Sequence, residues 1–169
     1  MAFNYSGQDF VSFGVYADVV QRDARLFESN EAVNNSTTVN ELMAKASQRI
    51  LTKLRNTDWW KEYQFSRDTS LKRDLRLLPS VDPDNIKSRE QEFKDLNVYF
   101  ALVEYILPTC ADFGNETSAE VVKIAFYRDA FDNLFKELVE AGDWYDFDAD
   151  GSVETGEKAP SLVNRVRVR

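Results

Sequence analysis

The sequence has 169 residues, of which 43% are hydrophobic and 30% charged, a composition typical of one globular domain with a single core. Its 21 basic and 29 acidic residues give a net charge of −8, which disfavours sequence-specific or broad contact with nucleic acid. With no histidine and one cysteine, Cys110, the chain excludes histidine-based catalytic triads, histidine-ligated metals, internal disulfides and thiolate clusters.

Neither a membrane span nor a targeting signal is expected. The first ten residues lack a basic start followed by an apolar block. The longest apolar stretch, residues 98–107, is interrupted by Glu104 and has half of the about 20 residues that a span needs. We therefore expect a soluble protein that needs no oxidising compartment, with Cys110 as a small core residue rather than a reactive thiol.

The N-terminal third predicts two helices separated by a polar loop at residues 31–37. The first and shorter one spans residues 16–28, with Val19, Val20 and Phe27 facing inward. The second runs from Thr38 to about residue 56, because Thr38 and Glu41 have the spacing of a capping box. Its apolar residues recur at intervals of three and four, the pattern of one buried helix face: Val39, Leu42, Met43, Ala46, Ile50 and Leu54.

A dense aromatic segment, TDWWKEYQF at residues 57–65, follows this helix. Large rings commonly cover the apolar face of a neighbouring helix, so we expect Trp59 in the core. Trp60 is predicted either in the core or at a contact between subunits. Residues 65–81 fit a short helix or an extended arm equally well.

Two more long helices are predicted in the C-terminal half. One begins at Asp82, followed by a first-turn proline, and ends at Pro108. The other begins at Thr117, with Glu120 in the capping position, and ends near residue 142. The predicted buried face of the first helix consists of Ile86, Phe93, Leu96, Phe100, Val103 and Leu107. That of the second consists of Val121, Ile124, Ala125, Phe131, Leu134, Phe135 and Leu138.

The predicted fold is therefore all-α, a small bundle of three to four helices with an extended, partly irregular C-terminal arm. We divide the chain into a helical domain (1–142), an acidic loop (143–160) and a basic C-terminal tail (161–169).

The acidic loop contains one chemical motif, DFDADGSVETGE at residues 146–157. Its alternating carboxylates and its glycine fit the EF-hand calcium loop, in which alternate oxygens wrap a cation around a tight turn. Calcium is thus the candidate cofactor. The candidate ligands are Asp146, Asp148, Asp150, Ser152 (through its carbonyl), Glu154 and Glu157.

The loop departs from a complete EF-hand in three ways. Residues 143–145 separate it from the preceding helix, Pro160 leaves almost no exiting helix, and the chain has no second loop to pair with it. A solvated acidic turn without metal is therefore the alternative to a calcium site. If calcium binds, a structural role fits better than a regulatory sensor.

The last nine residues, SLVNRVRVR, carry three arginines and no acid. Val166 and Val168 alternate with arginines, which is the period of a β-strand. The tail is predicted either to fray in solution or to join another protein's sheet or acidic groove. In the second case the partner-binding residues are Leu162, Val163, Arg165, Val166, Arg167, Val168 and Arg169.

The sequence does not predict an enzyme. It has only 6 glycines, no glycine-rich phosphate loop and no G-x-S-x-G motif. Acid pairs such as Asp129 and Asp132 are expected on a solvated helix face.

The layout as a whole resembles the head–tail adaptor (connector or neck) proteins of tailed bacteriophages. The resemblance is most specific at residues 38–63 and 144–169. It implies a homo-oligomeric ring, usually of twelve copies, between the portal protein and a downstream tail or neck protein, with residues 162–169 contacting the portal. It also implies a place in the neck of the virion, assembly in the host cytoplasm, a channel that DNA passes through, and no catalytic residues. The alternative is a helical calcium-binding protein with one EF-hand-like loop acting as a structural or sensor module.

Overall fold

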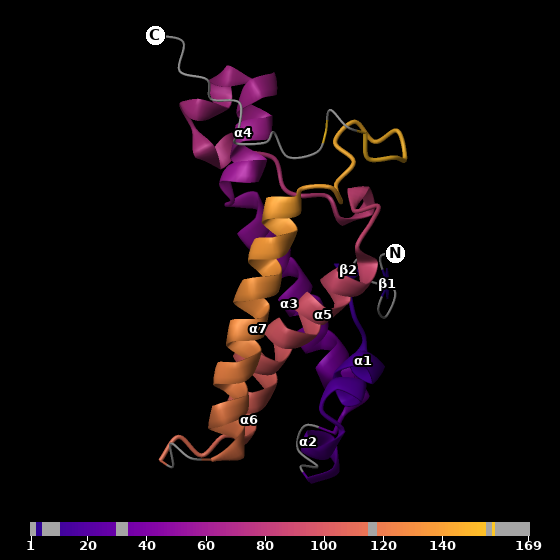
Figure 1. Ribbon diagram of the computed structural model, residues 1–169, viewed down its shortest axis with the longest axis vertical. Helices are drawn as coiled ribbons and strands as arrows, with labels where there is room; N and C mark the ends of the chain where they lie inside the picture. The colour runs from indigo at the N-terminus through magenta and orange to yellow at the C-terminus, as the bar shows by residue number, and fades with distance from the viewer. Residues whose placement is uncertain (1–2, 5–10, 30–33, 115–117, 155–156, 158–169) are drawn as a thin grey trace.

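A computed structural model of the chain describes residues 3–4, 11–29, 34–114, 118–154 and 157. They form an elongated helical body in which α3 (Ser36–Arg55), α5 (Glu90–Ala101) and α7 (Ala119–Ala141) run along the long axis (Figure 1). The middle helix, α5, packs against both of the others. The predicted all-α class is confirmed, with more helices than the three to four expected because several short ones lie between the long ones.

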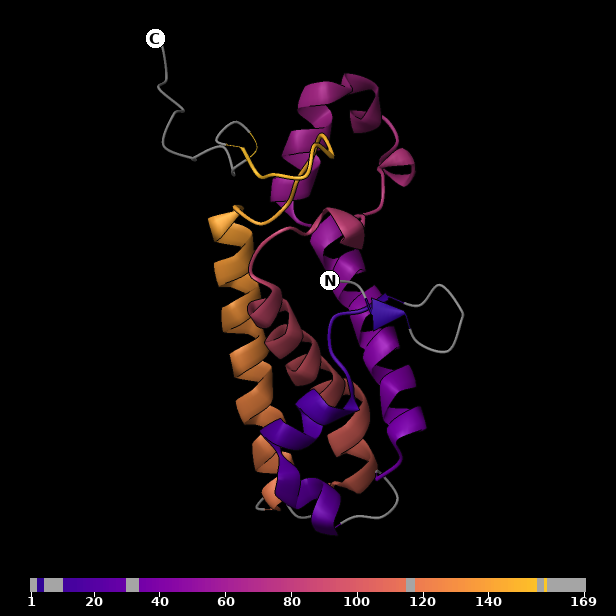
Figure 2. The same cartoon turned by 90° about the vertical axis from the view of Figure 1, so that its right-hand side faces the viewer.

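The N-terminal part packs across the long helices. Strands β1 (Phe3–Asn4) and β2 (Val11–Ser12) form a short antiparallel pair beside α3. Helices α1 (Tyr16–Arg22) and α2 (Ala24–Ser29) follow, and α1 contacts α3 and α5 (Figure 2). The single helix predicted for residues 16–28 is wrong, because the backbone leaves the helical region at Asp23, whose carboxylate accepts a hydrogen bond from Lys123 of α7 at 2.8 Å.

Helix α3 begins two residues before the predicted Thr38. The side chain of Asn35 accepts hydrogen bonds from the backbone N–H groups of Thr37 and Thr38, at 3.0 and 3.2 Å, and so caps the helix earlier. The predicted stripe of this helix is buried except for Leu42, which is half-buried.

The aromatic segment after α3 forms a helix, α4 (Asp58–Arg67), which the sequence analysis did not assign. Thr57 caps it through a 3.4 Å hydrogen bond from the N–H of Trp60. Of the two alternatives predicted for residues 65–81, the structure has the short helix, although of the 3-10 kind. The segment finishes α4 and continues as the 3-10 helices η1 (Thr69–Lys72) and η2 (Leu75–Leu77).

Both predicted ends of the next helix are wrong. Asp82 and Pro83 open only a 3-10 turn, η3 (Pro83–Asn85), and α5 starts at Glu90. Beyond Ala101 the chain continues through a short π-helix, η4 (Leu102–Ile106), into α6 (Leu107–Cys110), so Pro108 lies inside the last helical turns. A proline fits there because its missing N–H falls in the first turn of α6. The predicted stripe of this helix is buried, and Cys110 is half-buried against the core.

Helix α7 is capped by Ser118, one residue after the predicted Thr117, which lies outside the described residues. It ends at Gly142, whose φ of 54° is the left-handed conformation that favours glycine. Ile124, Phe131 and Leu138 are buried as predicted, whereas Ala125 is exposed and Tyr127 takes a core position. Among the described helices, none is long and apolar enough to cross a membrane.

Candidate functional site

The acidic loop is built on a platform of aromatic rings. Trp59 and Trp60 of α4 meet Trp144 and Tyr145, which follow α7, with ring centroids 4.7 Å apart for Trp59–Trp144 and 5.2 Å for Trp60–Tyr145. Trp59 is buried, as predicted. Trp60 is only 2% exposed, so the structure assigns it to the core.

Residues 143–146 are held against residues 85–89 by backbone hydrogen bonds. Tyr145 pairs with Ile86 in an antiparallel bridge. The N–H of Lys87 donates to the carbonyl of Trp144, and the N–H of Asp146 donates to the carbonyl of residue 85, both at 2.9 Å. The segment between α7 and the loop is therefore part of the body rather than a free linker.

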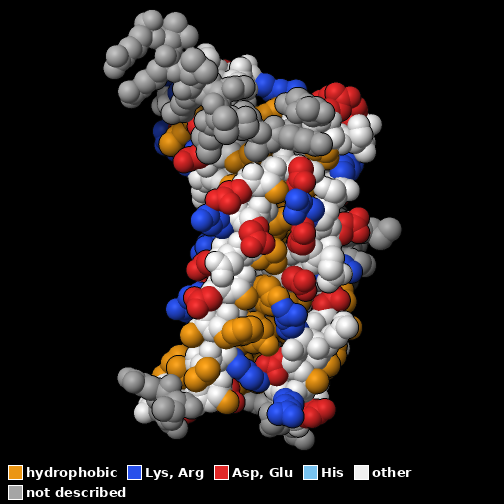
Figure 3. All heavy atoms as spheres, in the orientation of Figure 1, with side chains coloured by type: hydrophobic (Ala, Val, Ile, Leu, Met, Phe, Trp, Pro, Cys, Tyr) orange, Lys and Arg blue, Asp and Glu red, His pale blue; other side chains and the backbone are white. Residues whose placement is uncertain are grey.

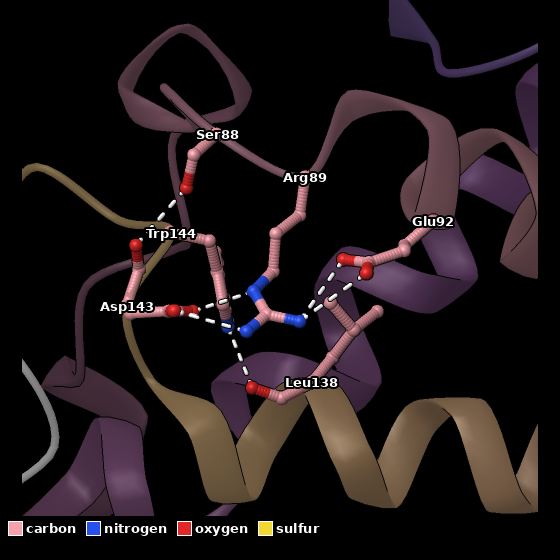
Figure 4. A network of polar contacts seen from close by, with 6 residues as sticks. All are labelled: Ser88, Arg89, Glu92, Leu138, Asp143 and Trp144. Carbon is pink, nitrogen blue, oxygen red and sulfur yellow. Dashed lines mark hydrogen bonds and ion pairs between the residues drawn. The ribbon is translucent and has the colours of Figure 1, made fainter.

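A side-chain network reinforces this attachment (Figure 4). The guanidinium of Arg89 forms two hydrogen bonds with the carboxylate of Asp143, at 2.6 and 2.9 Å, and a third contact with Glu92 at 3.2 Å. Ser88 donates to the carbonyl of Asp143 at 3.0 Å, and the indole N–H of Trp144 donates to the carbonyl of Leu138 at 2.7 Å. The hydrogen bonds with Asp143 raise the pKa of Arg89.

The loop then turns back over α4. The ring of Phe147 stacks on that of Tyr63, with centroids 3.4 Å apart, and on that of Trp60 at 5.6 Å. Asp146 and Asp148 flank Phe147 in the sequence, and their carboxylates accept hydrogen bonds from backbone N–H groups of the loop. The aromatic contacts therefore fix the position at which the acidic residues begin.

Two buried carboxylates organise the loop itself. Asp146 accepts hydrogen bonds from the N–H groups of Ala149 and Gly151, at 2.7 and 2.8 Å. Burial alone would raise the pKa of Asp146. The hydrogen bonds from these N–H groups and the positive charge of Lys87 together have a larger, opposite effect, so the pKa of Asp146 is lowered. Glu157 accepts from the N–H groups of Phe147 at 2.7 Å, Asp148 at 3.0 Å and Glu154 at 3.0 Å. Glu157 thereby ties the end of the loop to its start.

Three of the six predicted ligands come together. Carboxylate oxygens of Asp146, Asp148 and Glu157 all lie within 4.8 Å of one another, so this group could hold a metal ion. They occupy positions one, three and twelve of the predicted motif. Desolvation and the charges of Asp150, Glu157 and Asp146 raise the pKa of Asp148, a repulsion that a bound cation would relieve.

Two other predicted carboxylate ligands, Asp150 and Glu154, lie outside this group. Asp150 instead accepts hydrogen bonds from the N–H and O–H of Ser152, at 2.8 and 3.0 Å, and both residues are exposed, as is Glu154. Gly151 at position six has a φ of 100°, as the tight turn of the motif requires. Within the described ranges, no second group of three acidic or cysteine side chains could hold a metal.

The remaining predicted site residues divide as follows. The partner-binding residues 162–169 lie outside the described residues. Asp129 and Asp132 are exposed on α7, as expected. The sequence analysis missed the pairing of Arg89 with Asp143, 54 residues apart in the chain, since neither residue belongs to a recognisable motif.

No protein-family model, curated protein or solved structure matches this chain.

Proposed function

We propose that the chain is a structural virion protein of the head–tail adaptor kind. In this role, copies form a ring that joins the phage portal to a downstream tail or neck protein, and each C-terminal tail docks onto the portal. The ring lies in the neck of the virion, is assembled in the host cytoplasm, and performs no catalysis. The proposal rests on the layout of the sequence, which resembles this family from residues 38–63 and 144–169.

One structural observation carries the proposal: the base of the tail is anchored. Phe147 is stacked on α4, and Glu157 bonds to three backbone N–H groups near both ends of the loop. Glu157, the last described residue before the tail, is therefore held at a defined place on the body. A docking arm gains from such a base because less conformational freedom is lost when it binds.

Deletion of residues 161–169 tests this function. We expect the truncated protein to fold with an unchanged melting temperature, because the buried hydrophobic side chains of the described residues lie between positions 13 and 145. We expect it to lose binding to the portal encoded with it, measured by co-sedimentation. The matched control replaces Arg165, Arg167 and Arg169 with Lys, which keeps the charge and removes bidentate pairing. Undiminished portal binding by the truncated protein would contradict the proposed role of the tail.

A second function, calcium binding by the acidic loop, is favoured by the three grouped carboxylates. Calcium prefers hard oxygen ligands, and a cation at Asp146, Asp148 and Glu157 would bind both ends of the loop at once. The bound cation would stabilise the closed conformation of the loop that precedes the tail. We expect weak binding, because the loop has no second loop to pair with.

Calorimetry with calcium tests this second function. We expect one site per chain in the wild type and no heat for Asp148→Asn, whose exposed side chain contributes little to folding. Asp132→Asn, exposed on α7, is the control and keeps the wild-type heat. Saturating calcium at a hundred times its dissociation constant should stabilise the protein by about 2.7 kcal/mol. A flat titration at millimolar calcium would exclude the site.

A further inference from the structure

The exposed large hydrophobic side chains of the described residues gather in two places. Leu75 and Leu77 are 56% and 65% exposed in η2, next to α4. Phe113, Val122 and Phe126 are 65%, 59% and 63% exposed, in the loop before α7 and in its first two turns. The two places lie at opposite ends of the elongated body (Figure 1), and Figure 3 shows hydrophobic side chains gathered over the lower half of α7. Scattered exposed hydrophobic residues are normal, but grouped ones mark contacts.

The charges around the two groups have opposite signs. Exposed Lys72, Arg73 and Arg76 surround Leu75 and Leu77, and these five residues form what we term the basic knob. The single acid between them, Asp74, is paired with Arg76 at 3.0 Å, which leaves the knob with net positive charge.

The patch at the start of α7 is acidic. Asp112 precedes Phe113 in the loop, and Asp129 lies one helical turn after Phe126. Both acids are exposed, and together with Phe113, Val122 and Phe126 they form what we term the acidic patch. The nearest lysine, Lys123, forms an ion pair with Asp23, with an Nζ–Oδ2 distance of 2.7 Å. Its charge is therefore balanced by Asp23 and not by the acids of the patch.

We infer that the acidic patch of one copy of this chain binds the basic knob of a second copy. Each surface combines exposed apolar groups with one sign of charge, so the two complement each other in both respects, whereas neither complements itself. Such a contact is heterologous: it joins different surfaces, leaves one free surface at each end, and closes into a ring if the rotation allows. The inference rests on the proposed function only in that copies of the chain are expected to assemble.

Complementation between two variants tests the contact. Leu77→Asp damages the knob alone, and Phe126→Asp damages the patch alone. Because both side chains are exposed, both variants should melt like the wild type. Each should self-associate at least about tenfold more weakly than the wild type in sedimentation velocity. A one-to-one mixture should form a dimer and nothing larger, since one intact knob still meets one intact patch.

Gln48→Asp, exposed on α3, is the control and should assemble like the wild type. A wild type that remains monomeric at every concentration would overturn the inference, as would a mixture that remains monomeric. Portal binding by the same variants separates the two proposals. Portal binding without self-association would leave the adaptor function standing and remove this contact. Self-association through these surfaces without portal binding would do the reverse.

Discussion

Replacing Trp144 with Ala tests whether the segment after α7 belongs to the core. The indole is fully buried, its ring lies 4.7 Å from that of Trp59 and 5.0 Å from that of Phe93, and its N–H donates to the carbonyl of Leu138. These contacts join α4, α5 and the end of α7 at one side chain. Their loss should therefore weaken the whole body rather than the loop alone.

The magnitude follows from two contributions. Truncation of a buried tryptophan to alanine costs about 3–5 kcal/mol. The lost hydrogen bond adds about 0.5 kcal/mol, at the low end of the usual range, because the carbonyl of Leu138 keeps a second donor in the N–H of Gly142 at 3.1 Å. The total of about 3.5–5.5 kcal/mol is between about a quarter and the whole of the free energy of unfolding of a typical domain, which is about 5–15 kcal/mol.

Urea unfolding followed by circular dichroism measures this cost. With a slope of about 2 kcal/mol/M, the midpoint should fall by about 2 M. Trp144→Phe, which keeps a ring but loses the N–H, should lose less than half as much. Phe113→Ala is the matched aromatic control and should stay within about 0.5 kcal/mol of the wild type, since Phe113 is 65% exposed. A midpoint for Trp144→Ala close to that of the wild type would refute the assignment of Trp144 to the core.

Two further predictions concern the ion pair of Arg89 with Asp143 and two buried tyrosines. Arg89→Ala should destabilise the protein by about 1 kcal/mol, a small value because the side chains of Arg89 and Asp143 are 32% and 36% exposed. In 1 M salt the difference in stability between the variant and the wild type should be smaller. Equal urea midpoints for the two proteins would contradict a stabilising role of this pair. Burial raises the pKa of Tyr145 and Tyr127 above the usual value of about 10, because the folded protein favours the neutral phenol. The stability that these tyrosines contribute is therefore complete below about pH 10 and is lost as the pH rises through their folded-state pKa. Urea midpoints at pH 8 and pH 11 measure this loss, which Tyr145→Phe should reduce.

Local patterns in the sequence determined the parts of the fold that depend on spacing alone. The apolar residues of α3 and α5 recur every three or four positions, and such a stripe is buried whatever element covers it. The left-handed end of α7 at Gly142 follows from glycine's freedom at positive φ. The spacing of the acidic motif predicted five carboxylate ligands, and the loop brings three of them together, Asp146, Asp148 and Glu157.

Contacts between distant residues decided the rest. Asp82 does not begin a long helix, because the backbone that follows it pairs through Ile86 with Tyr145, about sixty positions away, and the N–H of Asp82 donates to the hydroxyl of Tyr145 at 3.2 Å. Trp60 is in the core because the rings of Tyr145 and Phe147 come back over α4. In each case a hydrogen bond or ring contact that only the folded chain provides outweighs a weak local preference.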